Sequence, residues 1–265
     1  MKPNGRSERA TYAIASLLAA PILLQPLVVI LSVFWARYES VLRHPDLAAR
    51  NPPTVSRAIV DPAIGDPFAN LMLICFAMLL YSVWRIGAAF YRPGLSQKLR
   101  TVWIAILFCE FVAAIGMVVL SQYTGAVSDS LHLLGSYMLF FGHGVGIPLS
   151  GIFILMDRKS RQPALAEIGR LAPLPYYPKV HPQLAHCVAL CALSFGGLYF
   201  GWEHVKAINN YGARVVFSMA EIVLLVAFET YVGSFTLLMF RYEGYRLRNA
   251  GQRVPIQEGM AASAE

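Results

Sequence analysis

Charged residues are scarce in this sequence of 265 residues: Asp, Glu, Lys and Arg together make up only 14% of the chain. A soluble domain carries about a quarter charged residues, so this scarcity excludes an ordinary aqueous globule. The sequence also lacks the alternating segments of about 10 residues that are typical of transmembrane β-barrels. No internal repeat and no separate polar domain interrupts the apolar character of the chain.

Cysteine is scarce as well, and its placement excludes the usual cysteine motifs. All four cysteines, Cys75, Cys109, Cys187 and Cys191, fall inside apolar runs. The spacing of Cys187 and Cys191 matches neither a redox motif nor a zinc motif. We interpret all four as small apolar packing residues and expect no metal and no other cofactor.

Long apolar runs dominate what is present. Hydrophobic residues make up 57% of the chain, and the longest runs reach the roughly 20 residues that a helix needs to cross a bilayer. We predict an all-α polytopic membrane protein, with six transmembrane helices in one bundle and a single transmembrane domain over residues 1–265. The expected spans are 11–35, 68–90, 101–121, 133–156, 185–202 and 214–240, with an outer loop at 36–67 and an inner loop at 157–184.

Lys and Arg are distributed unevenly between the two sides of these spans. On the side of both termini lie Lys2, Arg6, Arg9, Arg92, Lys98, Arg100, Arg158, Lys159, Arg161, Arg170, Lys179, Arg241, Arg246, Arg248 and Arg253. On the other side lie only Arg37, Arg43, Arg50, Arg57, Lys206 and Arg214. The bias predicts that both termini are cytoplasmic. It also explains the net charge of +7 without a nucleic-acid partner, and it makes the chain a multi-pass integral membrane protein, of the inner or plasma membrane if the host is bacterial.

Several ionisable residues fall inside the expected spans. Glu110 lies in the third span, His143 in the fourth, and Glu221 and Glu229 in the sixth. Such groups cost a few kcal/mol each at mid-depth, so they indicate a functional site or polar contacts between helices. Arg85, near the inner end of the second span, can extend its charged head to the interface instead.

Two histidines of the fourth span are spaced for a common face. His132 and His143 are eleven residues apart, close to three helical turns and about 16 Å along the axis. This spacing is compatible with two haem ligands, or with one polar face that has a catalytic His132 at its outer end. The haem interpretation is weak, because its possible partners His186 and His204 lie at opposite ends of the fifth span.

The outer loop has the features of a defined structure. It contains two Asp-Pro steps and Gly65 between Asp61 and Phe68, which indicate turns. Ser56 and Arg57 lie upstream in the same loop. It is interpreted either as a structural lid over the bundle or as a site where Arg57 binds a lipid head-group phosphate.

Three stretches together resemble the Frag/DRAM/Sfk family of six-span membrane proteins, in particular its branch related to the GPI-anchor lipid-remodelling factor. They are Pro53–Ile59 after the first span, Ala114–Ser121 with His132–Phe141, and Ser218–Glu221 in the last span. The segment from Asp61 to Phe68 and the long inner loop depart from the family pattern. The resemblance implies a role in lipid handling: remodelling of GPI anchors in one branch, phospholipid organisation in another and autophagy modulation in a third.

Two hypotheses for function follow. The first is lipid remodelling or acyl transfer at the outer side, with catalytic residues His132, Asp129, Glu110 and Glu221 and substrate-binding residues Ser56, Arg57 and His143. The second is a non-catalytic scaffold that binds membrane lipids or recruits a membrane-protein partner. A transporter is less favoured, because no matched pair of broken spans is evident in the two halves of the chain.

Overall fold

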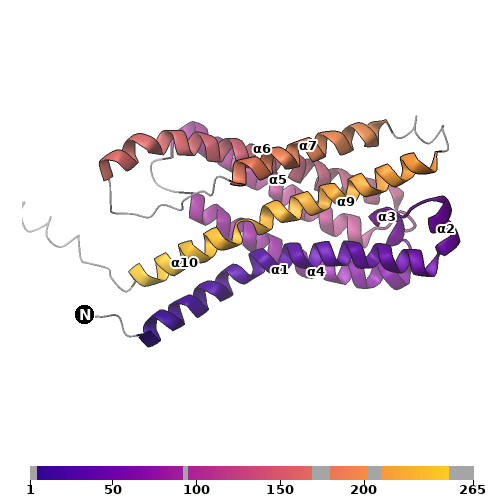
Figure 1. The fold of residues 1–265 in the computed structure, drawn as a ribbon, viewed down its shortest axis with the longest axis horizontal. Coiled ribbons are helices and arrows are strands. Elements are labelled where there is room, and N and C mark those ends of the chain that lie inside the picture. Colours follow the sequence, from indigo (N-terminus) through magenta and orange to yellow (C-terminus); the bar gives the residue numbers. More distant parts are fainter. Residues whose placement is uncertain (1–4, 92–94, 169–179, 202–209, 251–265) are drawn as a thin grey trace, which may run out of the picture.

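The computed structural model describes residues 5–91, 95–168, 180–201 and 210–250, and within these ranges the chain contains helices and turns but no strand. Figure 1 shows the arrangement of the helices along the length of the bundle. In chain order they are α1 (Gly5–Arg43), α2 (Pro45–Arg50), α3 (Val55–Ala58), α4 (Pro62–Phe90), α5 (Gln97–Gln122), α6 (Asp129–Ile168), α7 (Val180–Phe200), α9 (Tyr211–Gly233) and α10 (Thr236–Ala250).

The prediction of six membrane-spanning helices is confirmed. Six helical segments are long and apolar enough to cross a bilayer, and each overlaps one of the expected spans, although the fifth ends at Phe200 and not at residue 202. The loops are shorter than expected. The segment 36–67 is helical over much of its length, since α1 runs to Arg43 and α2 and α3 follow before α4 begins. In the segment 157–184, α6 continues to Ile168 and α7 starts at Val180, and residues 169–179 lie outside the described ranges.

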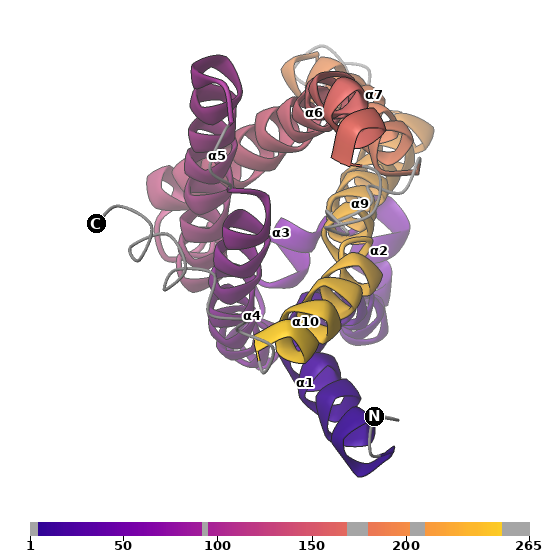
Figure 2. The same cartoon turned by 90° about the vertical axis from the view of Figure 1, so that its left-hand side faces the viewer.

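The six spans form a ring in sequence order. Each span packs on the next, from α1 through α4, α5, α6 and α7 to α9, and both α9 and α10 pack back on α1. Figure 2, which looks along the bundle, shows this ring, with α3 visible toward its middle. The closest pair is α5 and α6, where a Cβ at Gly142 would lie 2.7 Å from the backbone nitrogen of Ala113. Small residues allow such close approach between membrane helices.

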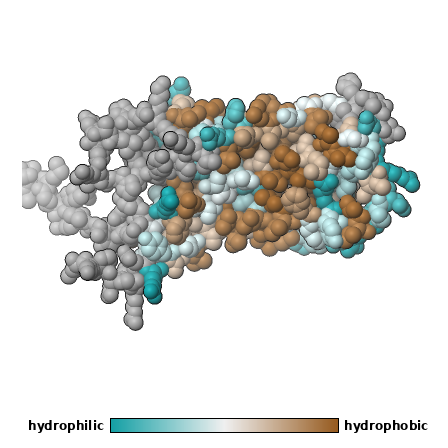
Figure 3. All heavy atoms as spheres, in the orientation of Figure 1, coloured by the Kyte–Doolittle hydropathy of each residue, from teal (hydrophilic) through white to brown (hydrophobic). Residues whose placement is uncertain are grey.

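The outside of the ring is apolar. Leu17 and Leu193 are 74% and 75% exposed, among many large hydrophobic side chains that face outward. Figure 3 shows apolar residues over the middle of the molecule and hydrophilic ones toward the end that holds α2 and α3. An apolar exterior of this extent is stable in lipid and not in water, where exposed apolar patches are small.

The first and the last described helices begin and end at the same end of the bundle. The start of α1, the end of α10 and the start of α5 lie at this end, and the α5–α6 turn lies at the opposite end with α2 and α3 (Figure 1). We call the latter the outer end, because Lys and Arg are concentrated on the side of the termini.

The sixth span is interrupted between α9 and α10. Because the helix is broken by the turn at Ser234, some backbone carbonyl groups inside the bundle lose their helical hydrogen bonds, and side chains form hydrogen bonds with them instead. The hydroxyl of Ser234 donates to the carbonyl of Tyr231 at 2.6 Å, and Thr236 donates to Gly233 at 2.7 Å. The ring of His181, from α7, lies with Nε2 3.1 Å from the Ser234 carbonyl. Such replacements allow a broken helix at membrane depth.

The environment of Arg85 differs from the expectation that its charged head extends to the membrane interface. Its side chain is only 12% exposed and pairs with the buried carboxylate of Glu243 in α10. Arg246 binds the second oxygen of the same carboxylate at 2.9 Å. The three side chains therefore join α4 to α10 near the inner end, where an isolated buried charge would be costly.

Candidate functional site

The segment between α2 and α4 is fixed to the sixth span at the outer end. Thr54 caps α3 by accepting from the Arg57 amide at 3.3 Å. The Val55 amide donates to Oε2 of Glu221 at 2.9 Å, and the Ser218 hydroxyl donates to the Pro53 carbonyl at 2.7 Å. A four-residue helix is too short to be stable alone, so these two contacts with α9 determine its position.

A small polar cavity lies beneath α3. It measures about 40 Å³, large enough for water but not for a lipid chain. Apolar side chains form most of its wall. Its polar lining residues come from α3, α5, α6 and α9: Ser56, Ser121, His143, Glu221 and Glu229.

Two polar pairs lie beside this cavity. Nδ1 of His143 is 2.9 Å from Oε2 of Glu110, so α5 and α6 share a buried imidazole–carboxylate pair. Gln25 of α1 donates from Nε2 to Oε2 of Glu229 at 3.0 Å. Among the described residues, Oε1 of Gln25 has no hydrogen-bond partner. An unpaired buried polar atom is most costly in lipid, which favours such contacts between helices.

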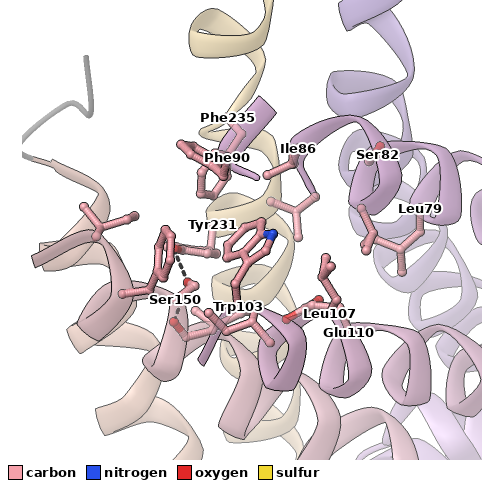
Figure 4. A pocket seen from close by; sticks show the side chains of 16 residues that line it. Leu79, Ser82, Ile86, Phe90, Trp103, Leu107, Glu110, Ser150, Tyr231 and Phe235 are labelled. Carbon is pink, nitrogen blue, oxygen red and sulfur yellow. Dashed lines mark hydrogen bonds between the residues drawn. The ribbon is translucent and has the colours of Figure 1, made fainter. Parts of the chain in front are cut away.

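A second cavity continues toward the inner end. It measures about 60 Å³, and Figure 4 shows Glu110 and Trp103 on one side of it and Tyr231 on the other. The hydroxyl groups of Tyr231 and Ser150 are hydrogen bonded to each other. Because Glu110 lines this cavity and its partner His143 lines the outer one, the imidazole–carboxylate pair lies between two water-sized spaces.

A wider groove opens at the outer surface. It measures about 400 Å³ and is formed by the end of α1, by α2 and by the segment leading to α4. Arg57 lines it, together with His44 and Asp61, whose side chains are 3.1 Å apart. Arg57 contacts the side-chain oxygen of Asn51 and the carbonyl of Pro52, both through Nη1. Pockets that bind small ligands have volumes of about 300 to 1,000 Å³, so this groove is large enough for a head group.

The charged residues that line this groove are Arg57 and Asp61, and the Asp61 carboxylate is paired with His44. Partial burial of the guanidinium lowers the pKa of Arg57, and the nearby Glu221 carboxylate opposes that shift. Within the described part of the chain, no acidic side chain forms a salt bridge with Arg37, Arg50 or Arg57. Arg43, in contrast, pairs with Glu39 at 3.1 Å. Of these arginines only Arg57 lines the groove, and a guanidinium group without an acidic partner at such a surface favours an anionic ligand.

The structure brings together some of the residues expected at the site. Ser56, His143 and Glu221 line the cavity beneath α3, and Glu110 reaches it through His143. Arg57 lies in the outer groove instead.

His132 and Asp129 lie apart from these residues. Nδ1 of His132 is 2.9 Å from the Tyr123 carbonyl, and neither His132 nor Asp129 lines either of the two small cavities or the outer groove. Asp129 is exposed at the start of α6. A joint catalytic role of His132, Asp129, Glu110 and Glu221 stays a prediction, without a shared cavity to support it.

The site also includes residues that the sequence did not single out as functional. Gln25 and Ser218 are the clearest cases. Ser218 is three residues before Glu221, so the helical repeat places both on one face. Gln25 is a polar residue in an apolar run, next to Pro26, which was a detectable signal.

The described residues provide no metal centre, since no three His, Cys, Asp or Glu side chains among them are placed to bind one ion. The haem hypothesis loses two of its histidines to other contacts: His143 pairs with Glu110, and His132 binds the Tyr123 carbonyl. His186 is exposed, and His204 lies outside the described ranges.

Comparisons of the sequence with protein-family models, with curated proteins and with solved structures give no match. The class of the protein therefore rests on its own fold. It is a multi-pass α-helical integral membrane protein with six spans, a buried cavity that contains polar groups, and an outer groove lined by Arg57.

Proposed function

We propose that this protein binds the phosphate-bearing head group of a membrane lipid in the outer groove, without itself changing the lipid covalently. The observation that carries the proposal is the position of Arg57, which α3 presents to a groove of about 400 Å³ at the membrane surface. The guanidinium group offers paired donors that match phosphate oxygens.

The buried part of the site has a supporting role in this proposal. Glu221 and Ser218 fix the backbone on both sides of Thr54, and so they fix the direction in which Arg57 leaves α3. Lipid handling also agrees with the resemblance to the Frag/DRAM/Sfk family, which itself stays a prediction.

Binding is favoured over catalysis by the geometry around His132. A general base must lie within hydrogen-bond reach of the proton that it removes. His132 shares neither the cavity that holds Glu221 nor the groove that holds Arg57. The cavity beneath α3, at about 40 Å³, has room for water rather than for substrate.

The test compares two arginines of the outer end in the full-length protein. Arg57→Gln removes the charge from the groove, whereas Arg43→Gln removes a charge that is paired with Glu39 and does not line the groove. Native mass spectrometry of protein from phosphatidylglycerol vesicles should show about tenfold weaker lipid retention for Arg57→Gln, and near wild-type retention for Arg43→Gln. Equal retention by the two variants refutes the proposal. Displacement by free inorganic phosphate identifies a phosphate site instead of a lipid site.

A second candidate is acyl transfer inside the bundle, which requires the cavity beneath α3 to widen from its about 40 Å³ to admit an ester. Ser56 and His143 line the same cavity, and Glu110 orients His143 through the 2.9 Å contact. In this reaction Ser56 Oγ attacks an ester carbonyl while its proton passes to His143, the acyl group moves to Ser56, and the lipid alcohol leaves with that proton. A fluorophosphonate probe should then label the wild-type protein and not Ser56→Ala. Absence of labelling in the wild-type protein eliminates this candidate.

A further inference from the structure

An apolar groove between α6 and α7 is separate from the sites described above. It measures about 380 Å³ and faces outward from the ring. Its walls are apolar or aromatic side chains of the two helices, and Leu224 of α9 also lines it. A Cβ at Gly196, which lines the groove, would meet no atom within 4 Å. The space is therefore left open by the packing of α6 against α7.

The polar groups of this region lie at the outer end. Ser136, Tyr137 and Tyr199 line the outer part of the groove, and Pro148 and Ala189 line the inner part. The rings of Tyr137 and Tyr199 meet edge to face with centroids 6.1 Å apart. From Ser136 to Pro148 the groove follows twelve residues of α6, or about 18 Å, which is more than half the thickness of the bilayer hydrocarbon.

Asp129 adds a negative charge above the groove. It lies seven residues before Ser136, close to two helical turns and about 10 Å further out, near the same helix face. Its carboxylate is exposed and close enough to act electrostatically on Tyr199. Within the described residues of α6 and α7, no other acidic or basic side chain lies at this end, apart from His132, whose Nδ1 faces the Tyr123 carbonyl.

We propose that the α6–α7 groove binds one zwitterionic phospholipid, with an acyl chain along the groove, its ester region at Tyr137 and Tyr199, and its ammonium group beside Asp129. From the inner end outward, the apolar groove, the two tyrosines and Asp129 follow the same order as the acyl chain, the ester groups and the ammonium group of a phospholipid. Tyrosine side chains favour the depth at which lipid esters lie, and a carboxylate with nearby aromatic rings attracts an ammonium group. This inference does not depend on the outer groove, where Arg57 has the opposite charge.

The chain offers a matched pair of variants. Gly196 and Gly197 are adjacent, and a Cβ at either would meet no atom within 4 Å, but only Gly196 lines the groove. Gly196→Leu fills the groove and displaces at least two methylene groups of the occupant, which weakens binding about tenfold. Gly197→Leu adds the same side chain beside the groove and leaves binding unchanged.

The experiment uses the full-length protein in vesicles that contain phosphatidylcholine with a photoactivatable acyl chain. Labelled peptides should come from α6 and α7, and labelling should fall about tenfold in Gly196→Leu but not in Gly197→Leu. Phosphatidylglycerol with the same chain should label less, and Asp129→Asn should reduce the difference between the two lipids about two- to fivefold. Arg57→Gln should leave the labelling unchanged, which separates this site from the outer groove.

Two results would overturn the proposal: equal labelling of wild-type protein and Gly196→Leu, or equal labelling by both head groups. If Gly196→Leu does not fold, Ala189→Leu replaces it, because Ala189 lines the inner part of the same groove.

Discussion

The buried acidic residues of the bundle have different partners, and the partner decides what each side chain contributes. Glu221 accepts a backbone amide, Glu110 pairs with His143, and Glu229 accepts from Gln25. Removing one partner from such a contact leaves the other buried and unsatisfied, which costs more than the contact contributes in the intact protein.

Replacing Glu221 tests its role as the anchor of α3. Glu221→Ala leaves the Val55 amide without its acceptor, so we expect a loss of about 1 to 3 kcal/mol in stability. Glu221→Gln keeps a carbonyl oxygen that can accept the same hydrogen bond, and should keep most of the stability. Thermal unfolding in detergent measures both, and trypsin cleavage after Arg57 reports release of α3. Equal losses in the two variants would mean that charge, not the hydrogen bond, fixes this segment.

Asp61 gives the outer end a dependence on pH. It caps α4, and the Ala63 amide and then His44 hold the pKa of its carboxyl below the usual value of 3.8. The carboxylate therefore stabilises the folded protein above that value, and the contribution is lost as the pH falls through the lowered pKa.

The wild-type protein should accordingly lose thermal stability below about pH 4, and Asp61→Asn should flatten this part of the profile. Asparagine is also a good N-cap, so helix α4 still forms in the variant. Parallel profiles for the two proteins would show that Asp61 does not cause the dependence. The measurement is the unfolding temperature in detergent over the acidic range.

At the scale of elements, the interface of α5 and α6 is the closest contact in the ring. Gly142 faces the backbone of Ala113 and Cys109, whereas Gly144, two residues further on, faces the side chain of Ala192. The two glycines therefore lie on the same helix, but only Gly142 has no room for a side chain.

A methyl group at these positions should have opposite consequences. Gly142→Ala places a Cβ 2.7 Å from a backbone nitrogen, so α5 and α6 must separate, at a cost of about 1 to 3 kcal/mol. Gly144→Ala makes an ordinary contact at 3.6 Å and should be neutral or slightly stabilising. Thermal unfolding of the two variants side by side measures the difference. Similar unfolding temperatures would contradict the close packing described for this pair.

Hydropathy and length were enough to predict the six spans, because crossing a bilayer requires a long apolar helix wherever it occurs. The same signal could not detect α2 and α3, since six- and four-residue helices have no hydrophobic period of their own. The position of α3 depends on Glu221 and Ser218, more than 160 residues away in the chain. The proximity of Ser56 and Glu221 could be expected, because the topology places both at the outer end. The distance of His132 from these residues could not be predicted, because the spacing of residues along a helix does not determine which face of the helix points into the ring.

At the scale of the whole molecule, the ring places its polar groups in two layers. Glu110, His143, Glu221 and Glu229 lie inside the bundle, and Arg57 lines the surface groove at the outer end. The direction in which this arrangement faces depends on the distribution of Lys and Arg, since the fold itself is compatible with either orientation.

Single cysteines in a variant without the four native ones test the orientation. Ala126 lies in the turn between α5 and α6 at the outer end, and Gln97 begins α5 at the opposite end. In intact cells, a membrane-impermeant maleimide should label Ala126→Cys directly and Gln97→Cys only after permeabilisation.

The opposite pattern would reverse the molecule in the membrane and turn the Arg57 groove toward the cytoplasmic leaflet. Anionic lipids are concentrated there in many membranes, and each basic residue near that surface contributes about 1 kcal/mol of attraction. The groove would then face a more abundant ligand, and Asp129 would face a less favourable one. Orientation therefore determines which of the two lipid sites faces the leaflet that favours its charge.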